Sequence, residues 1–150
     1  MDEIVRLFPD GLRHMIVQTV GDQWFQLEEI RLRLNTPIEF IFTHDVIWLE
    51  EIVVSEQIGQ YLLNKITDHS LYRMDTELKE GFITIKGGHR VGLAGEVITL
   101  EDQVDHIQYV TFFNIRIAKQ HTGIASPLLK YLHHENTYYN TLIIGPPQTG

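Results

Sequence analysis

The chain has 150 residues, 43% hydrophobic and 21% charged, which is the composition of an ordinary globular domain. Its net charge of −8 argues against broad binding to nucleic acid or anionic lipid, and the absence of cysteine excludes disulfides, thiolate zinc sites and cysteine nucleophiles. No apolar stretch approaches the roughly 18 residues of a membrane-spanning helix, and the acidic start is unlike a signal peptide, so we expect a cytoplasmic protein.

The first half of the chain is predicted to form two helices, three strands and a third helix. Apolar residues recur at helical spacing on either side of Pro9, a residue that favours the start of a helix. Strict alternation after residue 28 indicates a half-buried strand with Arg31 and Arg33 on a solvated salt-bridge face. Ser55 is a helix N-cap residue. The predicted ranges are 2–7 and 9–19 for the first helices, 29–34, 38–42 and 46–49 for the strands, and 55–66 for the third helix.

The second half is predicted to contain a hairpin, two further strands, a short helix and a final strand. The hairpin turns at Lys86, Gly87, Gly88 and His89. An apolar run just before Gly145 is typical of a buried parallel strand. The predicted ranges are 70–78 for a short helical stretch, 82–85 and 90–98 for the hairpin, 104–108 and 110–118 for two strands, 126–132 for a helix, and 141–144 for the last strand.

These elements predict an α+β fold followed by the start of another domain. Residues 1–135 read as a mixed, largely antiparallel sheet with helices, whereas residues 136–150 read as the first strand of a parallel α/β unit. The change from one pattern to the other falls around residues 120–137, and we place the domain boundary there.

The last six residues have the spacing of a phosphate-binding (Walker A) loop. In the pattern G-x-x-x-x-G-K-[ST], backbone N–H groups surround phosphate, the lysine pairs with it, and the hydroxyl binds Mg²⁺. We expect a longer protein, with ATP and Mg²⁺ as cofactors, of which this 150-residue chain is a part that binds neither and hydrolyses nothing. The alternative is a flexible tail. The candidate phosphate-binding residues are Gly145, Pro146, Pro147, Gln148, Thr149 and Gly150.

A second cluster lies in residues 81–95, which hold five of the eleven glycines. Two adjacent glycines support positive φ in a tight turn, and Gly92 and Gly95 indicate a bulge or a close backbone approach. His89 and Arg90 are candidates for binding phosphate or carboxylate; the alternative is a twisted hairpin with a solvated basic tip. Arg116 is either a wet-face strand residue or a residue that acts between domains or subunits.

No metal site is expected. His133, His134 and Glu135 are adjacent, and successive helical side chains diverge by about 100°, so they cannot readily converge on one ion.

A set of motifs runs over most of the chain in order. They are EIRLRL at 29–34 with Pro37, SLY at 70–72, GFITI at 81–85, GGHRVGLAG at 87–95, NIRIA at 114–118 and NTLIIGPP at 140–147. Together these motifs resemble the stage III sporulation protein AA family. That family continues into a RecA-like ATPase domain, and it is similar to secretion and pilus-retraction ATPases, which form hexameric rings with a PAS-like N-terminal sheet domain.

The resemblance implies the N-terminal domain of an ATPase that powers or assembles a sporulation channel, in the cytoplasm beside a membrane complex. Its partners would be its own ATPase domain, further copies in a ring, and membrane channel proteins, without nucleic acid. Arg90 and Arg116 are then the candidate catalytic residues, which reach the nucleotide or the acidic face of a neighbouring subunit. Two rival hypotheses are a nucleic-acid-binding module that uses the glycine-rich hairpin, and a purely structural oligomerisation domain.

Overall fold

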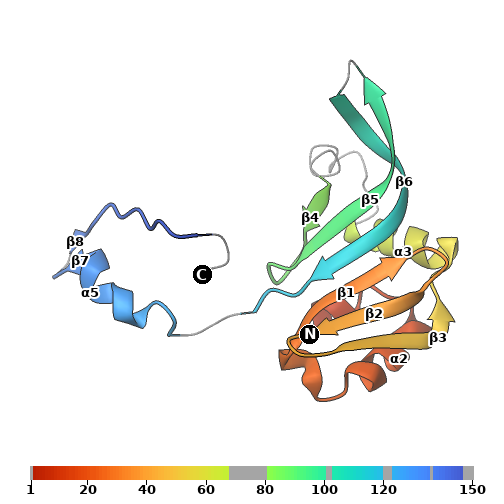
Figure 1. Ribbon diagram of the computed structural model, residues 1–150, viewed down its shortest axis with the longest axis horizontal. Coiled ribbons are helices and arrows are strands. Elements are labelled where there is room, and N and C mark those ends of the chain that lie inside the picture. Colours follow the sequence, from red (N-terminus) through yellow and green to blue (C-terminus); the bar gives the residue numbers. More distant parts are fainter. Residues whose placement is uncertain (1, 68–80, 101–102, 120–122, 136, 147–150) are drawn as a thin grey trace. The chain divides into compact units, whose positions relative to one another are not determined.

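A computed structural model describes residues 2–67, 81–100, 103–119, 123–135 and 137–146, and the chain divides into two compact units, Met1–Ala118 and Lys119–Gly150 (Figure 1). The predicted helical stretch at 70–78 lies outside the described residues. The predicted boundary at residue 135 stays a prediction.

The first unit is built on a six-stranded sheet in the order β3-β2-β1-β6-β5-β4, in which every pair of neighbours is antiparallel. β1 therefore pairs with β2, its neighbour in sequence, and with β6, which follows much later in the chain. The predicted α+β class with a largely antiparallel sheet is confirmed. The strands are β1 Leu27–Arg33, β2 Pro37–Phe42, β3 Val46–Val53, β4 Phe82–Thr84, β5 Arg90–Leu100 and β6 Gln103–Arg116.

Three helices begin and end near the predicted positions. Pro9 precedes α2, where its φ of −58° suits a helix start. The Ser55 hydroxyl accepts a hydrogen bond from the Ile58 N–H at 3.3 Å and so caps α3. The helices are α1 Asp2–Val5, α2 Asp10–Val20 and α3 Glu56–Ile66, and a 3₁₀ turn, η1, covers Gln23–Phe25.

The helices cover one face of the sheet and form a single core with it. Alternate strand residues point to that face, as in β1, where Ile30 and Leu32 are fully buried. They pack in one cluster with helix residues spaced one turn apart, such as Leu12 and Ile16 of α2. The opposite face of the sheet carries the polar residues of the same strands, such as Arg31 between those two buried positions.

β5 and β6 differ in extent from the strands predicted for residues 90–118. The expected strands at 104–108 and 110–118 are one strand, β6, because β5 pairs with it along its whole length. The pairing of β5 with β6 is irregular but continuous, because bulges shift its register without ending it. The register shifts lie at Ala94/Gly95, Glu96/Val97 and Ile98/Thr99. A Cβ at Gly95 would overlap the backbone carbonyl of Tyr109, which confirms the predicted bulge or close approach.

The second unit, described by itself, has little regular structure. The predicted helix at 126–132 appears as a 3₁₀ turn, η3 Ser126–Leu128, followed by α5 Leu129–Leu132. Two short strands, β7 His133–His134 and β8 Thr137–Tyr138, pair with each other.

The predicted strand at 141–144 is not confirmed, because residues 139–146 have no helix or strand. Leu142, Ile143 and Ile144 are 83%, 72% and 85% exposed. A parallel strand needs a hydrogen-bonding neighbour, and the described residues provide none for this segment.

Candidate functional site

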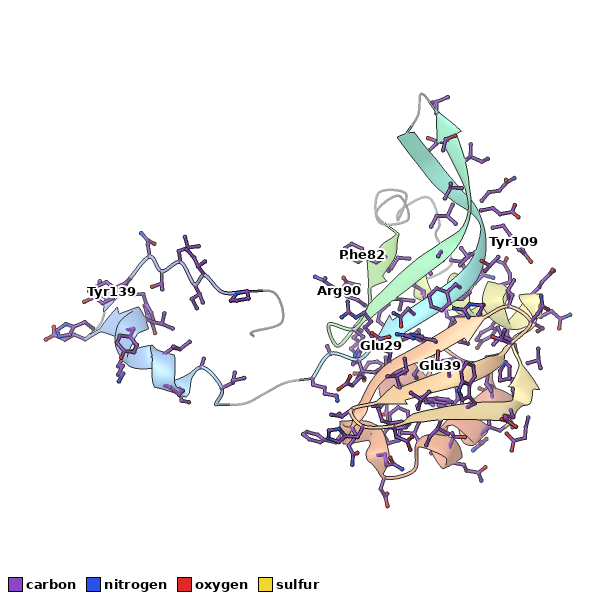
Figure 2. All side chains as sticks on the ribbon, viewed as in Figure 1. Glu29, Glu39, Phe82, Arg90, Tyr109 and Tyr139 are labelled. Carbon is purple, nitrogen blue, oxygen red and sulfur yellow. The ribbon has the colours of Figure 1, made fainter. Side chains whose placement is uncertain are left out.

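The structure brings together the two arginines singled out from the sequence. Arg90 of β5 lies opposite Arg116 of β6, and Arg116 lies opposite Glu29 of β1. Residues opposite each other on neighbouring strands project from the same face. The three side chains thus form one row across the sheet, on the face that the helices leave open, where Figure 2 shows Arg90 and Glu29.

Positive charge exceeds negative charge along this row. Arg116 Nε lies 3.5 Å from Glu29 Oε1, while Arg31 contacts Glu29 Oε2 through Nε at 2.9 Å and Nη2 at 2.8 Å. Arg31 Nη1 also lies 3.7 Å from Glu39 Oε2. Glu29 is therefore shared between two arginines, and the predicted salt bridge at Arg31 is confirmed.

Arg90 has no carboxylate partner among the residues that the structure describes. Its guanidinium carbon lies 5.2 Å from the centre of the Phe82 ring, a cation–π contact that leaves its N–H groups available. Like charges directly opposite each other on a sheet destabilise it, so an anionic group bound between Arg90 and Arg116 would remove an unfavourable interaction. A phosphate or a carboxylate fits this arrangement, because arginine binds both through paired N–H groups.

The rest of the open face combines arginine with aromatic rings. Arg33 stacks over Phe112, with 5.1 Å between its guanidinium carbon and the ring centre. Asn114, opposite Arg31, has a buried Oδ1 without a hydrogen-bond donor in the described part of the chain. Trp48 is 45% exposed. We define the open face as Glu29, Arg31, Arg33, Glu39, Trp48, Phe82, Arg90, Phe112, Asn114 and Arg116.

His89 is not part of this face, and the alternative that places it on a solvated basic tip is wrong, whereas its role in binding phosphate or carboxylate stays a prediction. Only 6% of His89 is exposed, and its Nδ1 accepts a hydrogen bond from the Ala118 N–H at 2.9 Å. Burial lowers the pKa of the imidazole, so the neutral ring that can accept this bond is favoured. The turn glycines predicted at positive φ are confirmed, with φ of 90° at Gly87 and 78° at Gly88. A Cβ at Gly87 would lie 2.8 Å from His89 Nε2, a contact that the sequence pattern did not reveal.

The candidate phosphate-binding residues fall mostly outside the described residues. Gly145 and Pro146 are described, and both are exposed. Pro147, Gln148, Thr149 and Gly150 are outside, so their role in binding phosphate stays a prediction.

Comparison with known proteins identifies the family. A family model described as "Sporulation stage III, protein AA" matches residues 1–150. The chain belongs to this family. It is 43% identical over 150 residues to the stage III sporulation protein AA of Bacillus subtilis (strain 168). The aligned region covers 100% of this chain and 48% of the Bacillus subtilis protein. The chain thus spans about half the length of this curated relative, and no solved structure matches it.

Two other findings bear on this family member. Within the described ranges, no group of three or more His, Asp or Glu side chains is placed to hold a metal ion. No helix in the described part of the chain is long and apolar enough to cross a membrane.

Proposed function

We propose that this chain is the N-terminal domain of an ATPase that powers or assembles a sporulation complex at a membrane, acting from the cytoplasm. Membership of the sporulation family supports the biological setting. The phosphate-loop spacing of Gly145 and Gly150 supports the nucleotide chemistry. The observation that carries the proposal is the row that sets Arg90 opposite Arg116, because two like charges placed opposite each other favour an anionic group between them.

In this proposal the two units have different tasks. Residues 141–144 become the first strand of a RecA-like domain once neighbouring strands are present, and residues 145–150 begin its phosphate loop for ATP and Mg²⁺. The sheet of the first unit acts as the PAS-like domain of such ATPases and supplies contacts between subunits of a ring. The exposure of Leu142, Ile143 and Ile144 supports this division, because apolar side chains of that size are usually covered.

Arg90 and Arg116 would contact the anionic group in the assembled protein. If the group is the nucleotide, an arginine that stabilises charge on the transferred phosphoryl group contributes roughly 10³-fold or more to the rate. If the group is a carboxylate of a neighbouring subunit, the arginines act in assembly, and high protein concentration restores activity to their variants.

The test is ATP turnover by the full-length protein carrying Arg90→Ala or Arg116→Ala, measured over a range of protein concentrations. Arg33→Ala is the matched control, since Arg33 lies on the same face and stacks on an aromatic ring as Arg90 does. We expect turnover to fall for the first two variants and to persist in the control, with stability changed by no more than about 0.5 kcal/mol. Parental turnover by both variants at every concentration would refute a role for the row, and a full-length protein without ATPase activity would refute the proposal.

A further inference from the structure

The sheet extends into a two-stranded ribbon beside which the described residues place no third strand. β4 pairs with β5 only as far as Gly92, and β1 pairs with β6 only as far as Phe112. Beyond these strand pairings, β5 and β6 pair only with each other within the part of the chain that the structure describes, and Figure 1 shows them projecting past the other strands. We call residues 95–100 and 107–110 the arm.

The arm exposes more apolar surface than a free ribbon would be expected to carry. Val97, Ile98, Leu100 and Tyr109 are 48%, 39%, 67% and 39% exposed. Two-stranded ribbons are marginally stable in water, and contiguous exposed apolar side chains mark interaction surfaces. At the base of the arm, Tyr109 and Glu56, the first residue of α3, line the same pocket, and the nearby carboxylate raises the pKa of the Tyr109 hydroxyl.

Charge restricts what can cover the arm. The sequence from Val91 to Ile115 contains no lysine or arginine and includes Glu96, Glu101, Asp102 and Asp105. Of these, Glu96 lies on the arm, is exposed and stands opposite Tyr109. A covering surface should therefore be positively charged and should offer aromatic or apolar contacts beside that charge.

The open face of this same chain has those properties. It carries four arginines and two glutamates, and Arg90 and Arg33 each lie against an aromatic ring. A copy cannot place its own arm on its own arginine row, because Glu96 follows Arg90 by six positions along β5, a separation of about 20 Å in a strand. Contact between the two surfaces must therefore join different molecules.

We propose that the arm of one copy docks on the open face of a second copy, with Glu96 facing Arg90 and Arg116. This inference rests on the assembly part of the proposed function and names the acidic group that meets the arginine row. The two surfaces differ, so the contact is head-to-tail: it leaves one arm and one face free in a dimer, and repeats either close into a ring or continue as a filament.

The test uses reciprocal charge reversals in the 150-residue chain and in the full-length protein. Glu96→Arg and Arg90→Glu are each followed by sedimentation velocity over a concentration series at low salt, where exposed charges are least screened. Each variant alone should associate about tenfold or more weakly than the parent, and an equimolar mixture of the two should recover association, because one arm and one face are again complementary. The matched control is Glu50→Arg, which reverses the charge of an exposed glutamate on β3 outside both surfaces and should leave association unchanged.

Several outcomes would overturn the inference. The first is that the parent protein stays monomeric both as the 150-residue chain and at full length. The second is that the mixture of the two variants associates no better than either variant alone. The third is that Glu96→Arg weakens association while Arg90→Glu does not. The last outcome would mean that another protein surface receives the arm. Melting temperatures near that of the parent show that the variants are folded. Because association is read without nucleotide, an inactive protein that still associates through these surfaces would refute the ATPase proposal alone.

Discussion

Two apolar runs of this chain have opposite fates. In β2, Phe40 and Phe42 are buried, whereas Leu142, Ile143 and Ile144 are at least 72% exposed. β2 has a strand on each side and takes part in a core that includes the helices, while the later run has neither among the described residues. A hydrophobic run thus becomes a core strand only where hydrogen-bonding neighbours and a covering layer are present.

The largest expected effect comes from truncating one side chain in each run. Phe40→Ala should destabilise the 150-residue chain by about 3–5 kcal/mol, because it removes a fully buried ring and leaves a cavity. Ile143→Ala should change the free energy of unfolding by no more than about 0.5 kcal/mol, since that side chain is mostly in water already. Urea denaturation measures both. Similar losses for the two variants would mean that the exposed run is covered in solution.

The same contrast can be made between two glycines. Gly95→Ala should destabilise by about 1–3 kcal/mol, because the new Cβ would force the bulge away from the Tyr109 carbonyl. Gly11→Ala, in α2, should stabilise by about 0.5–1 kcal/mol, because nothing lies within 4 Å of the added Cβ and alanine favours a helix. Thermal unfolding of both variants checks this difference in sign, and a Gly95→Ala variant as stable as the parent would show that the arm does not require this bulge.

The smallest expected effect concerns His89 and depends on pH. Burial lowers the pKa of His89 in the folded chain, so below its ordinary value of about 6.5 the unfolded chain binds a proton that the folded chain does not. Its contribution to stability is therefore complete above that value and is lost as pH falls through the folded pKa. Denaturation from pH 8 to pH 5 should show a shallower decline in the free energy of unfolding for His89→Ala than for the parent. Equal slopes for His89→Ala and the parent would contradict the buried neutral imidazole.

The sequence predicted what depends on neighbours along the chain. Pro9 and Ser55 mark helix starts, alternation marks β1, and Gly87 and Gly88 mark the turn, because each is a local property of backbone or side chain. The length of β6 could not be predicted in this way, since pairing with β5 fixes it.

The candidate site was likewise predicted only where it depends on local sequence. Arg90 and Arg116 were candidates from the sequence, but their position opposite each other depends on β5 and β6 being adjacent and on their register. The burial of His89 was missed for a similar reason, because its hydrogen-bond partner, Ala118, is distant in sequence. Non-local pairing decides both, and no local pattern encodes it.

We propose that the exposed run Leu142–Ile144 and the loop after it belong to a nucleotide-binding domain. Calorimetric titration of ATP with Mg²⁺ into the full-length protein and into the 150-residue chain tests it most directly. We expect saturable binding by the full-length protein and none by the 150-residue chain, because the phosphates need a lysine and a helix N-terminus after the second glycine of the loop. Micromolar affinity in the 150-residue chain, or no binding by the full-length protein, would contradict the account.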